Sequence, residues 1–238
     1  MKRRAFMSGV VGIVASFASV CSAQAGRAWD RIPSIVVMSP ENDVRLSPVR
    51  EAFSFWNSVF SGLGSPFRFG EMTHVVETIS MNDLYPYSSR KFFESYPRRV
   101  GEFDLPERLR KVDADVIVVL SDGKFDSFAF PILARTPAGL MGMQTRTHLV
   151  GIQSHLTRPA NLALNVIAHE LGHVVGLDHN DDVAALMCGG AWCWVKFPSE
   201  GVFPLTSKDK ASLLWMYPRD WQPNSPPGRR PNLLSNGK

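Results

Sequence analysis

Apolar residues recur along this chain in two periods, and each period predicts a different kind of element. The β-branched run at residues 32–38 predicts a first strand, and the run at 114–120, closed by Ser-Asp-Gly, predicts a buried one. Residues 66–79 predict one strand or two, whereas residues 85–107 carry no pattern that assigns them. Between residues 48 and 60 the spacing is helical and predicts an amphipathic helix, whose inner face comprises Val49, Phe53, Trp56 and Phe60.

A second helix follows two more predicted strands, at residues 140–145 and 147–153. Its apolar positions gather on one side, and His169 and His173 lie on the opposite side, about 40° apart around the helix. We therefore expect one side of the helix to face a core and the opposite side to present the two histidines. The apolar set comprises Leu164, Ile167, Leu171, Val174 and Val175.

The C-terminal part predicts one more helix and then a tail. The helix covers residues 208–217, and Thr206 and Asp209 have the spacing of a capping box at its start. Residues 219–238 are rich in proline and predict a disordered segment to which we assign no function. We therefore expect the folded domain to occupy residues 26–218.

Residues 1–25 predict an export signal. Three basic residues precede an apolar stretch, and Ala-Gln-Ala at residues 23–25 has the form of a cleavage site. Serines and glycines dilute the apolar stretch, which argues against a stable membrane anchor. The pair Arg3-Arg4 leaves both the general secretory and the twin-arginine route open. The mature protein is then periplasmic or secreted.

Charge and cysteine content refine this picture. Three of the 26 basic side chains and none of the 22 acidic ones lie in residues 1–25, so the mature chain is nearly neutral. Its charge gives no reason to expect a nucleic-acid partner, and we expect a monomer. Only Cys188 and Cys193 remain after the signal. An oxidising compartment favours a disulfide between them, and two free thiols are the alternative.

The chemistry concentrates in one segment, His169-Glu-Leu-Gly-His173-Val-Val-Gly176-Leu-Asp-His179. A helix holds His169 and His173 at a fixed separation, and neutral imidazole is the commonest protein ligand for zinc. Gly176 stands where the helix could end in a left-handed turn that returns His179 as a third ligand. Three histidines leave a fourth position open on the metal, which is typical of a catalytic zinc site.

This pattern of histidines and glycine resembles that of the metzincin zinc peptidases, and Gly176-Leu-Asp-His179 is most similar to their matrixin branch, in a bacterial-type exported form. The resemblance implies a methionine turn beneath the metal, at Met187. It also implies an α+β fold, with a twisted mixed five-stranded sheet, two helices and a C-terminal helix after the methionine turn. The order of the predicted elements agrees with this arrangement.

The implied function is that of an exported zinc-dependent endopeptidase. Zinc would activate a water, and Glu170 would act as the general base that takes the water's proton and passes it to the leaving amine. An extended protein or peptide substrate would pair with a sheet edge, for which residues 140–145 are the candidate. Trp192 and Trp194 would line the specificity pocket, in a segment that departs from the family pattern.

Other interpretations remain open at this stage. The chain could be a zinc-binding protein that presents a peptide groove without turnover, a pseudoenzyme, although binding alone needs no base at Glu170. It could also be a structural domain with incidental histidines. A weak calcium site at Asp122 and Asp126 is a further alternative. Neither the substrate nor the means by which activity is restrained follows from the sequence.

Overall fold

A five-stranded mixed sheet forms the centre of the molecule. The structure is a computed structural model that describes residues 28–80, 82–84, 106–133, 146–154, 156, 161–189, 193 and 201–224. The elements, in chain order, are β1 (Ile35–Ser39), α1 (Leu46–Leu63), β2 (Met72–Val76), α4 (Glu107–Arg110), β3 (Val116–Leu120), β4 (Phe128–Leu133), β5 (Arg146–Ile152), α5 (Leu162–Val174) and α6 (Ser207–Met216). The predicted signal, residues 1–25, lies outside the described residues.

The strands lie in the order β2-β1-β3-β5-β4. All neighbouring pairs are parallel except β4 and β5, which are antiparallel. The α+β fold class with a mixed five-stranded sheet is therefore confirmed. β4 was not predicted from the sequence, because Pro131 interrupts its apolar run. Proline lacks a backbone donor and is tolerated mainly on edge strands, and β4 pairs with β5 alone among the described strands.

The sheet separates two apolar cores, because successive side chains of a strand point to opposite faces. Val116 and Val118 of β3 face α1 and α5, whereas Ile117 and Val119 belong to a second cluster on the other face. All five residues of β3 are buried. Burial on both faces explains why this strand reads as an unbroken apolar run.

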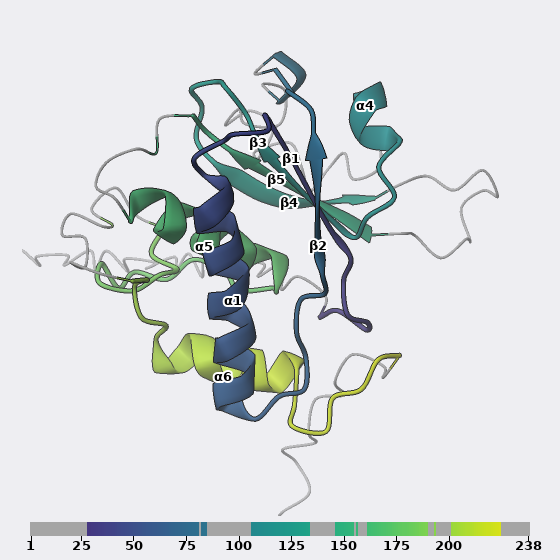
Figure 1. Cartoon of the computed structure of the whole chain (residues 1–238). Coiled ribbons are helices and arrows are strands. Elements are labelled where there is room, and N and C mark those ends of the chain that lie inside the picture. Colours follow the sequence, from purple (N-terminus) through teal and green to yellow (C-terminus); the bar gives the residue numbers. More distant parts are fainter. Residues whose placement is uncertain are drawn as a thin grey trace, which may run out of the picture.

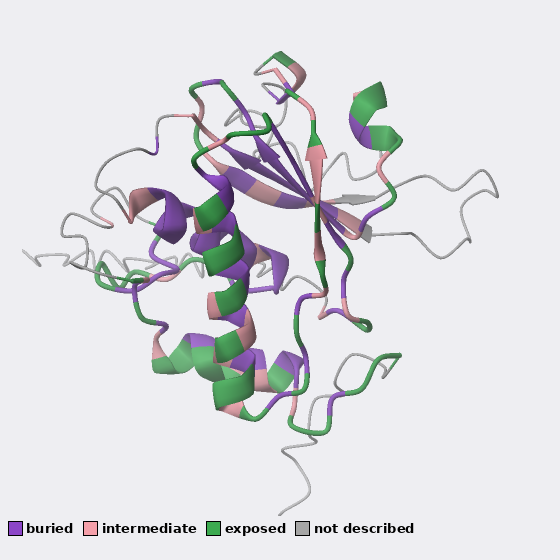
Figure 2. Ribbon diagram, viewed as in Figure 1, coloured by how far each residue is buried: buried purple, intermediate pink, exposed green. Residues whose placement is uncertain are grey.

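α1, α5 and α6 lie together on one side of the sheet, whereas α4 lies apart from them and contributes Leu109 to the second core (Figure 1). α1 and α5 pack together, α5 also lies against β4 and β5, and α6 packs on α1. Exposed residues follow the outer side of α1, whereas α5 is buried on nearly all sides (Figure 2). The helix that carries the histidines is therefore held in place from several directions. No helix in the described ranges has the length and apolar character needed to cross a membrane.

The last helix begins as predicted, but buried residues extend past the predicted end of the domain. The capping box is present, since Thr206 Oγ1 accepts from the backbone of Asp209 and the Asp209 carboxylate accepts from the backbone of Thr206. The core does not end at residue 218, where we predicted the domain to end. Trp221 is buried, and its indole Nε1 donates to Trp29 O at 3.1 Å. Residues 225–238 lie outside the described residues.

Candidate metal centre

α5 is fixed one residue before its first histidine. The indole Nε1 of Trp56, from α1, donates to the carbonyl oxygen of Ala168 at 2.9 Å. Trp56 is fully buried, so this contact joins the two helices inside the core. His169 and His173 then follow one turn apart on α5.

The turn predicted at Gly176 is present. Gly176 has φ +95°, a left-handed conformation that glycine adopts without a steric penalty. Leu177 N donates to Gly172 O at 2.9 Å, and Gly176 N donates to His173 O at 3.0 Å. These two bonds form the Schellman arrangement that ends helices. They reverse the chain and return His179 toward α5.

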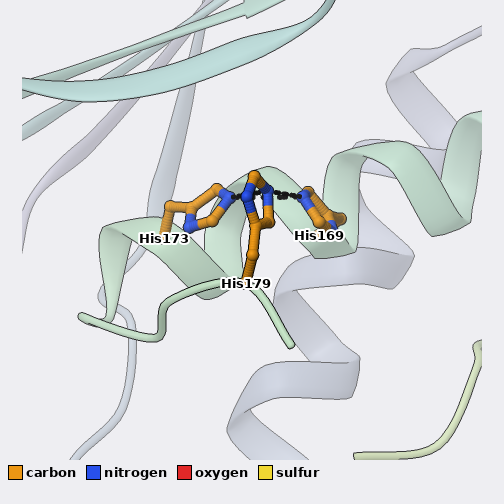
Figure 3. Close-up of side chains that lie close together, drawn as sticks. All are labelled: His169, His173 and His179. Atoms are coloured by element: carbon orange, nitrogen blue, oxygen red, sulfur yellow. Dashed lines mark hydrogen bonds between the residues drawn. The ribbon is translucent and has the colours of Figure 1, made fainter. Parts of the chain in front are cut away.

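The three imidazoles point toward one another (Figure 3). Their Nε2 atoms are 3.1 Å apart for His169–His179 and for His173–His179, and 3.2 Å apart for His169–His173. Tetrahedral zinc with Zn–N bonds of about 2.0–2.1 Å places its nitrogens about 3.3 Å from one another. The spacing therefore fits a zinc ion held by three histidines.

Backbone carbonyls fix the tautomers of the two helical histidines. His169 Nδ1 lies 2.7 Å from Leu186 O, and His173 Nδ1 lies 2.8 Å from Leu177 O. A carbonyl can only accept, so each Nδ1 carries the proton and each Nε2 presents a lone pair. Two lone pairs 3.2 Å apart cannot form a hydrogen bond with each other. A cation bound between the rings would satisfy both lone pairs.

Burial keeps these rings neutral, the form that ligates metal. Desolvation lowers the pKa of His169 to about 4 and that of His173 to about 3. The pKa of His179 is also lowered, again mainly by burial. At neutral pH all three rings are therefore uncharged.

Glu170 lies between the two helical histidines in sequence and is buried, with 6% of its surface exposed. Desolvation raises the pKa of its carboxyl group to about 8. Positive charge at the histidine nitrogens would act in the opposite direction and favour the carboxylate. A carboxyl group with a pKa near neutrality can both take up and release a proton.

The segment at Met187 lies directly under the histidines. Met187 is fully buried, and its carbonyl oxygen accepts from Asn180 N at 2.8 Å. The preceding residue, Leu186, supplies the carbonyl that orients His169. A Cβ built on Gly172 of α5 would lie 2.3 Å from Met187 Sδ. Only glycine at this position lets the methionine sulfur approach the helix so closely.

Sequence reasoning missed three residues that shape the site. Gly172 is one, although a glycine inside a helix costs about 1 kcal/mol relative to alanine and could have been taken as a signal of close packing. Gly189 is another, since a Cβ there would lie 2.3 Å from His179 Cγ. The third is Asn180, which follows the last histidine and donates to the carboxylate of Asp209 at 3.1 Å. Nothing in the sequence indicated that pair.

The remaining predicted site residues have different outcomes. The disulfide between Cys188 and Cys193 is present and confirms the prediction. Trp192 and Trp194 lie outside the described residues, as does the strand predicted at 140–145. Calcium binding at Asp122 and Asp126 is not supported, because in the described part of the chain the three histidines are the one group with metal-ligand spacing.

Comparison with known proteins agrees with the geometry. Residues 110–218 match the family model of the matrixins. No curated protein matches the chain. The matched segment spans β3 to α6 and includes the three histidines, Glu170 and Met187. The match supports a matrixin-like metzincin catalytic domain, and the match and the histidine cluster together support a zinc metallopeptidase.

Proposed function

We propose that this matrixin-like chain is an exported endopeptidase that hydrolyses peptide bonds with a zinc ion held by His169, His173 and His179. The observation that carries the proposal is the convergence of three neutral Nε2 atoms at separations of 3.1–3.2 Å. Bound zinc would acidify water and polarise a carbonyl group. A closed structural site would instead contribute a fourth protein ligand, and no fourth one is present within the described residues.

Glu170 is the proposed general base. It follows the first histidine on the buried helix α5, which limits the freedom of its backbone. Its raised pKa, about 8 before any positive charge is added, suits a group that accepts a proton from water and returns it to the leaving amine. The two histidine–carbonyl bonds keep the neighbouring rings in fixed orientations while the proton moves.

β4 is the proposed edge for an extended substrate. It is the antiparallel edge strand among the described strands and packs against α5, the helix that carries His169 and His173. Main-chain pairing at a sheet edge gives affinity that tolerates many sequences. The wall formed by Trp192 and Trp194 remains a prediction and would supply selectivity.

Export is supported by two independent features. Residues 1–25 have the charge and apolar pattern of a signal. The Cys188–Cys193 disulfide suits an oxidising compartment such as the periplasm or the extracellular medium.

Cleavage of an unbiased peptide library by the zinc-loaded protein, residues 26–238, tests the proposal. Glu170→Gln should keep one zinc per chain and lose about 100- to 10,000-fold in kcat/KM, the usual contribution of a general base. Glu51→Gln is the matched control, since Glu51 is exposed on α1, and it should retain full activity. A Glu170→Gln protein as active as the control would contradict the assigned role. Bound zinc with no cleavage by the unsubstituted protein would favour a peptide-binding groove without turnover.

A further inference from the structure

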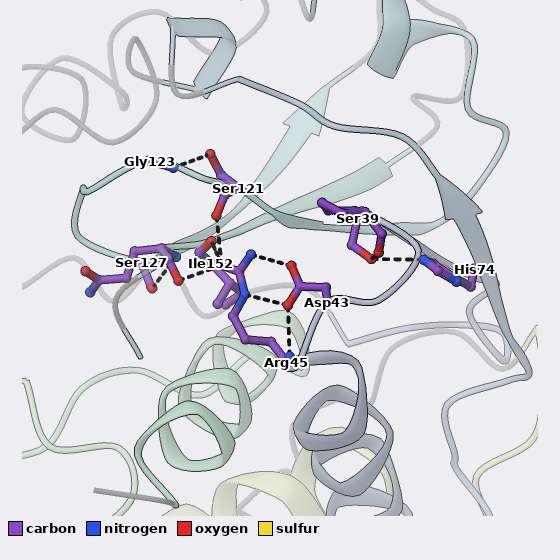
Figure 4. A network of polar contacts seen from close by, with 10 residues as sticks. Ser39, Asp43, Arg45, His74, Ser121, Gly123, Ser127 and Ile152 are labelled. Atoms are coloured by element: carbon purple, nitrogen blue, oxygen red, sulfur yellow. Dashed lines mark hydrogen bonds and ion pairs between the residues drawn. The ribbon is translucent and has the colours of Figure 1, made fainter. Parts of the chain in front are cut away.

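Arg45 lies at the start of α1, and its side chain reaches away from the helix into the end of the sheet (Figure 4). Only 6% of Arg45 is exposed. The carboxylate of Asp43 accepts from Nε at 2.9 Å and from Nη2 at 2.5 Å. Burial opposes ionisation of Asp43, but hydrogen bonds and charge from Arg45 outweigh it and lower the pKa of the carboxyl group. The pair is therefore ionised and buried.

The third nitrogen of the guanidinium contacts only backbone. Arg45 Nη1 donates to the carbonyl oxygens of Ser121 at 2.8 Å, Ile152 at 3.2 Å and Gln153 at 2.7 Å. Ser121 follows the last residue of β3, and Ile152 ends β5. One guanidinium thus joins the carboxyl ends of two neighbouring parallel strands.

The same cluster continues to the residue that precedes the edge strand β4. Gln153 N donates to Ser127 Oγ at 3.3 Å, and Ser127 directly precedes β4. Ser154 N donates to Gly123 O at 2.9 Å, which ties the segment before β4 to the segment after β5. We call these residues, Asp43, Arg45, Ser121, Ser127 and Gln153, the strand-end clamp.

Side-chain packing fixes the register of β4 at the same point. Phe128 pairs with Gly151 of β5. A Cβ on Gly151 would lie 2.5 Å from the Phe128 ring, so this ring covers the glycine. Phe128 is buried and belongs to the second core. The clamp holds the backbone where β4 begins, and the ring holds its register.

We propose that Arg45 is a positioning residue for peptide substrates, because the strand-end clamp holds the start of β4, the edge strand that packs against the helix of His169 and His173. The inference rests on the proposed endopeptidase function. None of these hydrogen bonds of Arg45 goes to a histidine, to Glu170 or to Met187. Loss of the clamp should therefore impair binding along β4 while leaving the metal ligands in place.

Two changes at Arg45 probe this role. Arg45→Lys keeps the charge but cannot reproduce a planar fork that binds a carboxylate and three carbonyls together. Arg45→Met combined with Asp43→Asn removes both charges and so leaves no isolated buried ion. The matched control is Arg31→Met, since Arg31 binds Asp115 just before β3, at the opposite end of that strand.

The kinetic measurement compares an extended peptide with a shortened version of the same peptide. An extended peptide spans β4 on both sides of the scissile bond, and a truncated one keeps only the residues that flank this bond. For Arg45→Lys we expect KM for the extended peptide to rise about tenfold, the equivalent of one or two net main-chain hydrogen bonds, with kcat nearly unchanged. The truncated peptide and the Arg31→Met control should change less than about twofold.

A structural readout keeps the test independent of turnover. Zinc content should stay at one per chain, and amide hydrogen exchange should quicken in residues 121–133 and 146–154 but not in β2. An equal loss for both substrates, or unchanged exchange in β4, would overturn the inference. If the unsubstituted protein cleaves nothing, the proposed function fails, while exchange still decides whether Arg45 orders β4.

Discussion

Two polar clusters, the strand-end clamp and the three histidines, differ in how the donors and acceptors of their hydrogen bonds are matched. In the strand-end clamp, each guanidinium nitrogen of Arg45 has an acceptor, from Asp43 or from a backbone carbonyl. In the histidine cluster, the Nε2 atoms of His169 and His173 face each other, and both are acceptors because each Nδ1 donates to a backbone carbonyl. The first cluster is satisfied by groups of the protein itself, whereas the converging acceptors of the second suit a bound cation.

This difference indicates that the strand-end clamp stabilises the fold, whereas the histidine cluster is suited to bind a ligand. A cluster whose donors and acceptors balance stabilises one arrangement of the chain and has no capacity left for a ligand. A cluster of converging acceptors is unfavourable within the protein alone and gains its stability from what it binds. Substitutions in the two clusters should accordingly have opposite effects on folding and on zinc binding.

The largest expected effect comes from His179→Ala. Removing one of three ligands should abolish stoichiometric zinc binding and lower kcat/KM by at least about a thousandfold, because the metal supplies much of the rate enhancement. The unfolding free energy of the metal-free protein should change by less than about 1 kcal/mol, since His179 is exposed. Elemental analysis and urea unfolding measure the two quantities. His74→Ala, on β2, should retain its zinc; a retained zinc in His179→Ala would exclude the three-histidine site.

Asp43→Ala should have the reverse pattern. It leaves the buried Arg45 charge without its carboxylate, which costs about 3–5 kcal/mol of unfolding free energy. Zinc content should be unchanged in the fraction that folds. Urea unfolding monitored by tryptophan fluorescence gives the first value. The control is Asp30→Ala, whose contact with Arg31 is long, 3.9 Å, and exposed, so the loss there should stay below about 1 kcal/mol. Equal losses in the two variants would mean that the clamp is not a special source of stability.

A smaller effect is expected from Gly189→Ala, which tests how firmly the third ligand is held. The new Cβ would overlap His179 Cγ and Cβ, which lie 2.3 and 2.5 Å away, and the imidazole must move. Displacing an orienting contact of a ligand typically costs about 10- to 100-fold in metal affinity. Competition with a chromophoric chelator measures that affinity. Gly62→Ala has open space around its Cβ and should bind zinc normally, whereas equal affinities would show that His179 can adapt.

The smallest expected effect is that of mild acid on the two clusters. Protonated imidazole cannot bind zinc, and the ring pKa values of about 4 for His169 and about 3 for His173 lie below the ordinary 6.5. Protons therefore compete with zinc only as the pH falls toward these lower values, and zinc should remain bound at pH 5.5. The pKa of Asp43 is lowered below 3.8, so the clamp should also remain ionised at pH 5.5. Zinc release at stepped pH provides the measurement, and half-release above pH 6.5 would contradict the neutral, buried rings.

The candidate metal ligands could be predicted from sequence because their geometry is local. A helix fixes His169 and His173, and one left-handed residue, Gly176, returns His179. The strands at β1, β3 and β5 and the capping box were equally accessible, because each follows from a short pattern. The fold class was available through the same elements together with the family resemblance.

The rest depends on contacts between distant segments. β4 contains Pro131, which local patterns interpret as a break, and only the sheet order shows that it lies at an edge. Asp43 and Arg45 stand in a polar segment that suggests an exposed loop, yet the Arg45 carbonyl partners lie up to 108 positions away. Gly189 became informative only when its distance to His179 was known. The aromatic pocket at Trp192 and Trp194 stays a prediction.

The separation of 108 positions between Arg45 and Gln153 also bears on the order in which the molecule folds. α1 can form from its own sequence, but the guanidinium at its start has no carbonyl to bind until β3 and β5 are aligned. Contacts that close long loops form late, after the entropy of closure has been overcome by other packing. The strand-end clamp should thus form only after the sheet has assembled. It should therefore lower the unfolding rate more than it raises the folding rate.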